Sequence, residues 1–168
     1  MIRRKLGVLV VVALAASVIA LPAGAQAHNG SHEDNEYVLV TQRLDWHSAN
    51  AAARQMVADG CQSAHLATIT SQAEQAIVTA LVNGEGDIAW IGGFQGGPTL
   101  SDNWHWVSGE KFDFTKWAGG EPNDTPFGDL DPGSEQHLQV LPDTAPGNWN
   151  DAPGFEENYF VVESRHCG

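Results

Sequence analysis

The stretch "WHWVSGEKFDFTKWAGGEPND", Trp104 to Asp124, lies in the part of the chain that decides the fold. From Gly92 to Gly154 the sequence is rich in Gly, Pro, Asp, Asn and Trp, and only "WHWVSG" and "HLQVL" interrupt this composition. A loop region of this length is unusual inside one compact domain, and it is typical of a segment that has a function or that a ligand orders. We therefore expect the functional site in this region.

The sequence on either side has ordinary secondary-structure patterns. Asp45 precedes an Ala-rich segment as a possible helix cap, and Ser71 with Glu74 forms a capping box before a second amphipathic segment. Gly60 and Gly84 are the expected helix ends. We predict helices over 45–60 and 71–84, and strands over 37–42, 64–70, 88–94, 137–141 and 158–164. This pattern indicates an α+β domain.

The first 27 residues read as a secretory signal peptide. A basic start at Arg3, Arg4 and Lys5 is followed by an apolar run and by Ala25-Gln26-Ala27, which predicts cleavage before His28. The alternative is an uncleaved anchor, but the apolar run is short for a membrane span and ends in Pro and Gly. We expect a secreted protein, extracellular or periplasmic, with no membrane insertion. Residues 28–36 are expected to be a flexible lead-in, and 37–168 the folded domain.

The remaining 141 residues are strongly acidic. The whole chain has 8 Lys and Arg against 21 Asp and Glu, and three of the basic residues belong to the signal segment, so the mature net charge is about −16. This balance argues against nucleic acid and anionic membrane surfaces as partners. Cys61 and Cys167 are the two cysteines, and outside the cytoplasm we expect them to form one disulfide. Two free thiols are the alternative.

Two polar motifs in the loop region carry oxygen ligands. "EPND" begins at Glu121, and a cis bond before Pro122 would turn the oxygens of Glu121 and Asn123 toward one point. Glu135 precedes the strand-like "HLQVL", and "GNWND" with Asn150 and Asp151 follows that strand. The strand can therefore bring Glu135 and the "ND" pair back beside the first loop. Taken singly, Asp and Asn are ordinary turn residues, so the prediction depends on the combination.

The chemistry of this set favours calcium. Three carboxylates and two amides offer oxygen alone, and Ca²⁺ takes six to eight oxygen ligands in flexible geometry. Zn²⁺ prefers Cys or His in tetrahedral arrangement, and Mg²⁺ takes fewer protein ligands and more water. The scattered histidines, His105 and His137 among them, are interpreted as ordinary polar residues. Trp104, Trp106, Trp117 and Trp149 are interpreted as framework aromatics, with stacking against a sugar as the alternative.

The segments "HLATITSQAEQ", "WIGG", "WHWVSGEKFDFTKWAGGEPND", "SEQHLQVL", "NWND" and "YFVVE" together resemble the landmarks of the C-type lectin-like domain. The likeness runs from Tyr37 to about Glu163. It implies an α+β fold with two helices, two small antiparallel sheets and a long ligand-binding loop region. It also implies that Pro122 is cis. The implied ligands of a calcium ion that also holds two sugar hydroxyls are Glu121, Asn123, Glu135, Asn150 and Asp151.

The resemblance implies a calcium-dependent lectin with glycans or glycoconjugates as partners. "EPN" in this family is associated with mannose-type sugars, which have neighbouring equatorial hydroxyls. The chain departs from the family pattern because His137 and "APGFEEN" carry no Cys for the second disulfide, and because "TPFGDLDPGS" is inserted before Glu135. A protein-interaction or adhesion module with little sugar binding is the alternative. An enzyme is not expected, because a glycosidase needs two carboxylates that flank a bond rather than share one cation.

Overall fold

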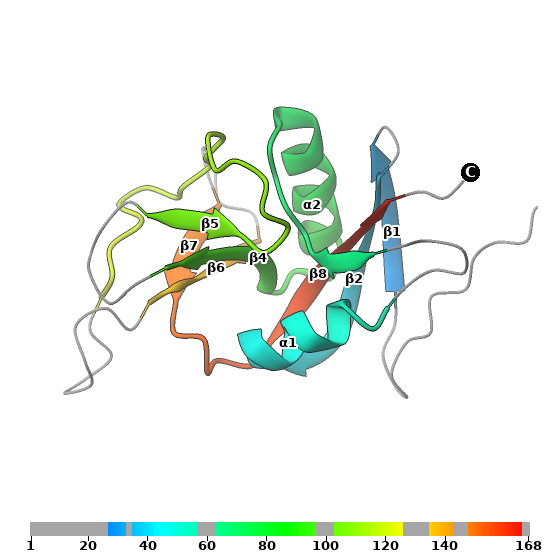
Figure 1. Cartoon of the computed structure of the whole chain (residues 1–168), viewed down its shortest axis with the longest axis horizontal. Coiled ribbons are helices and arrows are strands. Elements are labelled where there is room, and N and C mark those ends of the chain that lie inside the picture. Colours follow the sequence, from blue (N-terminus) through cyan, green and yellow to red (C-terminus); the bar gives the residue numbers. More distant parts are fainter. Residues whose placement is uncertain are drawn as a thin grey trace, which may run out of the picture.

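A computed structural model describes residues 27–32, 35–56, 63–96, 103–125, 135–142 and 148–165. Residues 1–26, both cysteines and most of the insert before Glu135 lie outside these ranges, so the signal peptide and the disulfide stay predictions. The elements are β1 (Ala27–His32), β2 (Asn35–Leu44), α1 (Trp46–Ala53), β3 (Ala64–Leu66), α2 (Gln72–Glu85), β4 (Ala89–Gln95), β5 (Trp104–Trp106), β6 (His137–Val140), β7 (Trp149–Ala152) and β8 (Asn158–Arg165) (Figure 1).

The strands follow the order β1-β2-β8-β4-β6-β7, with β3 paired to β8 and β5 paired to β4. All pairings are antiparallel except β4 with β8, which pair in parallel through Ala89 with Tyr159 and Trp90 with Phe160. This short parallel contact joins the β1-β2-β8-β3 group to the β5-β4-β6-β7 group. The two small sheets expected from the sequence are therefore one continuous path in the structure. The predicted α+β fold with two helices is confirmed.

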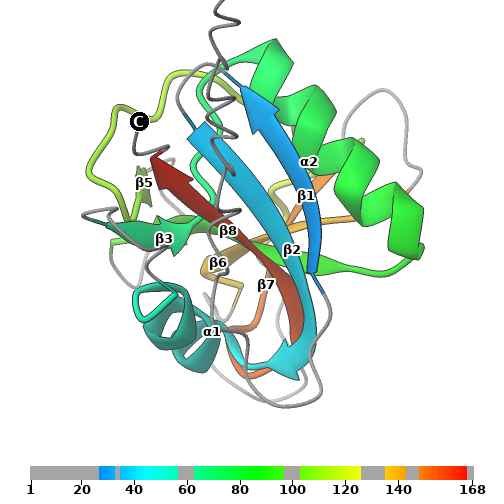
Figure 2. The same ribbon diagram turned by 90° about the vertical axis from the view of Figure 1, so that its right-hand side faces the viewer.

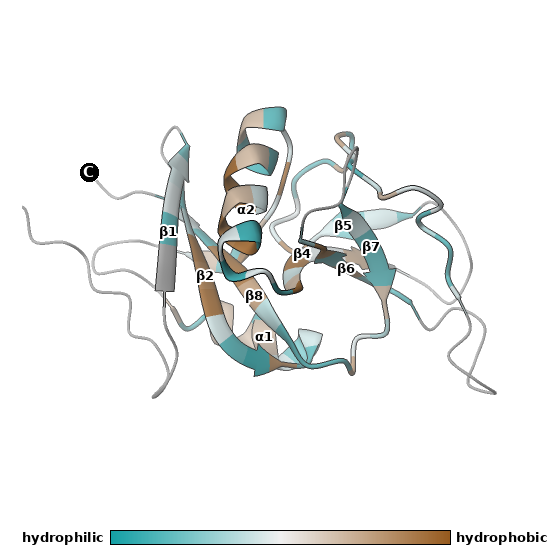
Figure 3. Ribbon diagram, turned by 180° about the vertical axis from the view of Figure 1, so that it is seen from behind, coloured by the Kyte–Doolittle hydropathy of each residue, from teal (hydrophilic) through white to brown (hydrophobic). Residues whose placement is uncertain are grey.

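The core lies on both faces of β2 and β8. Successive side chains of a strand point to opposite faces, and in β2 Tyr37 and Leu39 join one hydrophobic cluster whereas Val38 and Val40 join the other. Helix α2 contributes to the first cluster and α1 to the second, and Figure 2 shows the two helices at different sides of these strands. Figure 3 shows hydrophobic residues along the middle of β2 and on α2. This explains why residues 37–40 in the middle of β2 are continuously apolar.

The helix starts follow the expected capping chemistry. The Asp45 side chain accepts a hydrogen bond from the Ser48 N–H at 3.0 Å, and the Ser71 hydroxyl accepts one from the Glu74 N–H at 3.3 Å. These bonds satisfy N–H groups that have no partner inside the helix. The Glu74 carboxylate in turn accepts from the Thr70 N–H at 2.7 Å. No described helix is long and apolar enough to cross a membrane.

Three expectations differ from the structure. Residues 28–36 were expected to be a lead-in, but 27–32 form β1, which pairs with β2 along its length. Helix α1 ends at Ala53 rather than near Gly60, because the chain turns there and buries Met56 in the hydrophobic cluster to which α1 contributes. Helix α2 continues through Gly84 and ends at Gly86, whose φ of 68° is the left-handed conformation that glycine adopts at helix ends.

Candidate functional site

The strand β7 and the segment before "EPND" are tied together by backbone hydrogen bonds. The N–H groups of Asn148 and Trp149 both donate to the Lys116 carbonyl at 2.9 Å, and the Ala118 N–H donates to the Trp149 carbonyl at 2.9 Å. A parallel bridge links Trp117 with Trp149. The two motifs that the sequence separates by about 30 residues therefore start from adjacent positions in the fold.

Aromatic packing holds this region in place. Trp104, Trp106 and Trp149 are buried, and Trp117 is half-buried against the same cluster. The Trp149 indole N–H donates to the Gln75 side chain of α2 at 2.7 Å. Trp104, Trp106 and Trp149 are thus framework residues, as the sequence analysis favoured.

The turn after Trp117 has special backbone geometry. The Glu121–Pro122 peptide bond is cis, and both Gly120 (φ 99°) and Asp124 (φ 45°) have positive φ angles. The Glu121 N–H donates to the Ala118 carbonyl at 3.1 Å, which closes the turn before the cis bond. This geometry directs the residues after Pro122 toward β7.

Asp151 is the centre of the arrangement. Its carboxylate is fully buried and accepts the Asn123 N–H at 3.1 Å and the Asp124 N–H at 2.9 Å. The buried Asp124 accepts the Glu135 N–H at 3.3 Å, so the start of the β6 segment joins the same group. The backbone hydrogen bonds of these residues therefore bring 123–124, 135 and 151 together.

The remaining predicted residues surround this centre. The Thr125 N–H donates to the Glu135 carboxylate at 2.6 Å and to the Asn123 side-chain oxygen at 2.9 Å. Asn150 is half-buried, and its amide donates to the Asp151 carbonyl at 2.7 Å. Asn123 is exposed. The loop thus presents amide and carboxylate groups to solvent around a buried carboxylate.

Two acidic side chains of the loop have raised pKa values. Burial first, and then the charges of Asp151, Glu121 and Asp124, together raise the pKa of Glu135 to about 7, against the lowering effect of one N–H from Thr125. Burial and the neighbouring Asp151 carboxyl also raise the pKa of Glu121. One carboxylate oxygen of Glu121 and one of Asp124 are buried without a hydrogen-bond partner. These acids therefore repel one another in a poorly solvated place.

The side chains are gathered but do not form a closed ligand shell. Within the described residues, no group of three or more His, Cys, Asp and Glu is arranged closely enough to hold a metal ion. The Asp151 and Glu135 carboxylates are instead occupied with backbone N–H donors. The inserted residues 126–134, with Asp129 and Asp131, lie outside the described ranges.

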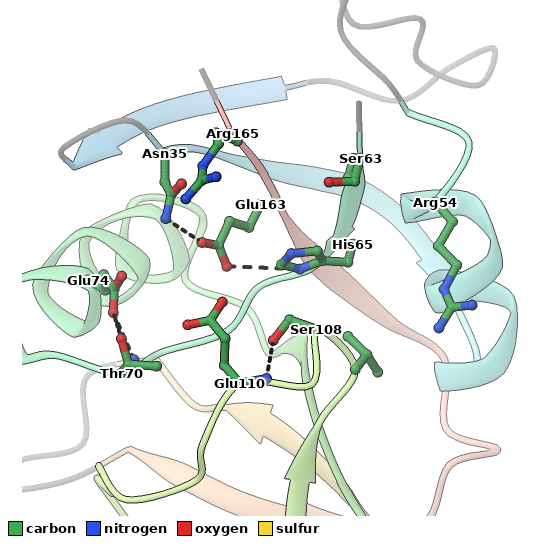
Figure 4. Close-up of a pocket in the computed structure, with 12 residues that line it drawn as sticks. Asn35, Arg54, Ser63, His65, Thr70, Glu74, Ser108, Glu110, Glu163 and Arg165 are labelled. Carbon is green, nitrogen blue, oxygen red and sulfur yellow. Dashed lines mark hydrogen bonds and ion pairs between the residues drawn. The ribbon is translucent and has the colours of Figure 1, made fainter. Parts of the chain in front are cut away.

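The structure also contains a polar cavity that the sequence patterns do not predict. It has a volume of about 810 Å³ and lies at the other end of β8, where Glu163 faces His65 and Asn35, with Glu74 and Glu110 nearby (Figure 4). Each of these residues looks ordinary in the sequence. The one available signal was an acid, Glu163, directly after the apolar strand residues "FVV".

Comparison with known proteins gives the family. The Lectin C-type domain family matches residues 42–163, which is most of the chain. The chain belongs to this family. It is 36% identical to lithostathine-2 of Mus musculus over 113 residues, which cover 66% of this chain and 59% of the mouse protein. It is 31% identical to hepatic lectin of Gallus gallus over 153 residues, which cover 86% of this chain and 62% of the chicken protein.

The matched segments thus span about three fifths of the length of these two relatives. Among solved structures, the C-type lectin domain of murine dendritic cell inhibitory receptor 2 in complex with N-glycan superposes with a TM-score of 0.65. It is 23% identical, and the superposition covers 87% of this chain and 99% of that domain. At this identity the likeness shows the fold. Family membership makes this a lectin-like domain and gives no indication of catalysis.

Proposed function

We propose that this chain is a secreted, calcium-dependent carbohydrate-binding domain. The observation that carries the proposal is the convergence of Glu121, Glu135 and Asp151 on the loop beside β7, where burial and mutual repulsion raise the pKa of both glutamates. A cation at this place would remove the repulsion. The lectin family and the exposed amide of Asn123 support a glycan as the ligand.

The donor set fits calcium. The predicted ligands, Glu121, Asn123, Glu135, Asn150 and Asp151, offer oxygen atoms of the kind that Ca²⁺ binds. The buried, unpartnered carboxylate oxygen of Glu121 is an acceptor that a cation would satisfy. When bound, calcium would supply positive charge and open coordination positions for two sugar hydroxyls.

The residues of the chain provide the rest of the recognition. The Asp151 carboxylate accepts hydrogen bonds from the backbone N–H groups of Asn123 and Asp124 and so holds this part of the backbone in place. Carboxylates accept hydrogen bonds from sugar hydroxyls and amide N–H groups donate to them, so mixed carboxylates and amides fix which hydroxyl pair fits. The "EPN" order at 121–123 supports a mannose-type sugar with neighbouring equatorial hydroxyls.

A protein-interaction module on the same fold is the second candidate. One observation favours it: the described acids do not form a metal-holding cluster, and two of the carboxylates already accept backbone N–H bonds. In this case the loop would be stabilised by its own hydrogen bonds and would present a polar surface to a protein partner.

Calcium titration by calorimetry tests the first proposal. We expect calcium binding by the parent chain, a higher melting temperature with calcium, and glycan-array signals for mannose-type sugars that a chelator removes. Glu121→Gln and Glu135→Gln should lose calcium and glycan together, and Glu157→Gln, an exposed acid outside the loop, is the matched control. Unchanged calcium affinity in both loop variants would refute the assignment, and calcium binding with a silent array would favour the interaction module.

We also propose secretion, with cleavage between Ala27 and His28. Cleavage there would leave β1 with residues 28–32, which still pair with β2 through His28 and Leu39 onward. The intact mass of protein recovered from the medium or periplasm checks this position.

A further inference from the structure

Another cavity, separate from the Glu163 cavity, lies between α1, the end of β4 and the start of β6. Its volume is about 580 Å³, which is within the size range of small-molecule sites. None of the five predicted calcium ligands lines it, but Gln136, the neighbour of Glu135, does. We call it the α1 cavity and define it by Trp46, His47, Asn50, Arg54, Phe94 and His137, which carry the argument.

Aromatic rings form one wall of the α1 cavity. Phe94 of β4 and His137 of β6 are directly paired across the sheet. The Trp46 ring centroid lies 4.4 Å from that of His137 and 6.0 Å from that of Phe94, and the His47 ring is 5.1 Å from that of His137. Rings from a helix and two strands therefore make a continuous apolar surface, against which the C–H face of a pyranose ring can pack. From its sequence context His137 was expected to be an ordinary polar residue, but it is part of this wall.

Polar groups without partners belong to the same wall. Eight buried side-chain atoms among the described residues lack a hydrogen-bond partner, and four of them belong to residues that line this cavity: Asn50 Oδ1, Gln95 Oε1, Trp106 Nε1 and His137 Nδ1. Buried polar atoms are normally paired, so such a concentration indicates an incomplete site. Rotation of the Asn50 and Gln95 amides would turn these groups toward a ligand in the cavity. The Asn50 and Gln95 oxygens are acceptors, which suits a ligand with hydroxyl donors, whereas His137 Nδ1 lies against Gly154, outside the cavity lining.

The charge of the cavity differs from that of the protein. The chain has 21 Asp and Glu residues and a net charge of −13, yet none of the described residues that line the α1 cavity is an acid. Arg54, at the end of α1, is exposed, and its guanidinium has no ion-pair partner within the described residues. Arg54 also lines the Glu163 cavity, and Figure 4 shows its side chain on the α1 side of that cavity, apart from Glu163 itself. A guanidinium without an ion-pair partner among the described residues, beside a cavity whose described lining holds no acid, favours a carboxylate on the ligand.

We propose that the α1 cavity binds a sugar residue that carries a carboxylate, and that it does so without calcium. The pyranose face lies on Phe94 and the Trp46–His137 pair, the carboxylate meets Arg54, and the hydroxyls donate to the unpaired wall acceptors. The choice of a sugar rests on the proposed function. The cavity does not include the loop that carries the five predicted calcium ligands, here called the calcium loop. An acidic sugar unit of a glycan would therefore bind in the cavity beside another sugar unit held at the calcium loop.

Two methyl glycosides that differ only in the carboxylate test the proposal. Methyl glucuronide and methyl glucoside are titrated in excess chelator, with tryptophan fluorescence and protein NMR shifts as readouts. We expect millimolar binding of the glucuronide, about tenfold weaker binding of the glucoside, and shifts at the Trp46 and Trp106 indole N–H signals. Arg54→Gln should remove the difference between the two sugars, and Phe94→Leu should weaken both.

Lys111→Gln is the charge-matched control, because Lys111 is exposed, pairs with Asp113 and does not line the cavity. Equal binding of the two sugars by the parent chain, a glucuronide preference that survives Arg54→Gln, or shifts confined to the calcium loop would overturn the proposal. Because calcium is absent throughout, these outcomes are independent of whether the loop binds calcium. Failure of the calcium proposal shows instead in the calorimetry of Glu121→Gln and Glu135→Gln.

Discussion

Glu163 makes the stability of the fold depend on pH. Its side chain is buried, and both carboxylate oxygens have partners: Asn35 and Tyr37 of β2 donate to one oxygen at 2.7 Å and 3.3 Å, and the Thr68 N–H donates to the other at 2.8 Å. Burial first, and then the charges of Glu110 and Glu74, together raise the pKa of Glu163 to about 7, against the lowering effect of the Thr68 N–H. The folded protein therefore binds the Glu163 proton more tightly than the unfolded chain does.

The size and sign of the effect follow from the two pKa values. The ordinary pKa of 4.5 and the folded value of about 7 differ by an amount that corresponds to about 3 kcal/mol. Below pH 4.5 the Glu163 carboxyl is protonated in both the folded and the unfolded state, so it does not lower the free energy of unfolding. As the pH rises from 4.5 to 7 the unfolded chain loses its proton first, so the free energy of unfolding falls by about 3 kcal/mol across this window.

Urea unfolding of the parent chain and of Glu163→Gln, from pH 4.5 to 8 in the presence of a chelator, measures this contribution. Glutamine stays neutral, so the parent should lose about 3 kcal/mol relative to the variant as the pH rises through the window. Other groups titrate in the same range, but they are common to both proteins and cancel in the difference. Glu157→Gln, an exposed control, should give a flat difference. A difference between parent and Glu163→Gln that does not change with pH would refute the reasoning.

Further predictions concern the calcium loop and α2. Calcium affinity should weaken about tenfold or more between pH 7.5 and 5.5, because the pKa of Glu135 is about 7 and a proton competes with the cation. Calorimetry at the two pH values checks this, and the Glu135→Gln variant should lose the pH dependence. Gln75→Leu should lower the free energy of unfolding by about 2 kcal/mol, since it leaves the buried Trp149 indole N–H without its acceptor; urea unfolding measures it, and an unchanged midpoint would contradict it. Gly86→Ala should cost about 1 kcal/mol because φ is 68° there. Gly84→Ala, in the last turn of α2 with open space for a Cβ, should stabilise by about 0.5 kcal/mol, and paired thermal melts distinguish the two.

Local patterns predicted those elements whose causes are local. The capping residues Asp45 and Ser71 mark the starts of both helices, and these starts agree with the structure. The strand β1 was not predicted, because "AHNGSH" has low strand propensity and becomes a strand through pairing with β2. The early end of α1 has a similar cause, since burial of Met56 in the core outweighs the helical pattern of the residues around it.

The calcium loop and the Glu163 cavity differ in how visible they are in the sequence. The loop is made from two short motifs, and a strand between them indicates that they return to one place. The Glu163 cavity is made from single residues on β2, β3, β8, α2, the end of α1 and the connections between elements, and apart from the capping residue Glu74 none of them belongs to a sequence pattern. Convergence of isolated residues depends on strand register, such as His65 opposite Glu163 in the β3–β8 pair, which the sequence does not specify.

Both places hold glutamates with a pKa near 7, yet their surroundings indicate different roles. Donors from β2 and from Thr68 surround the Glu163 carboxyl, so it can be accommodated without a cation. Glu135 receives one N–H bond and otherwise faces Asp151, Glu121 and Asp124, and an oxygen of Glu121 has no partner at all. Saturating calcium should therefore abolish the part of the pH-dependent stability that Glu135→Gln removes and leave the part that Glu163→Gln removes. Loss of both parts on adding calcium would mean that Glu163 also senses the cation, and the distinction between the two places would be wrong.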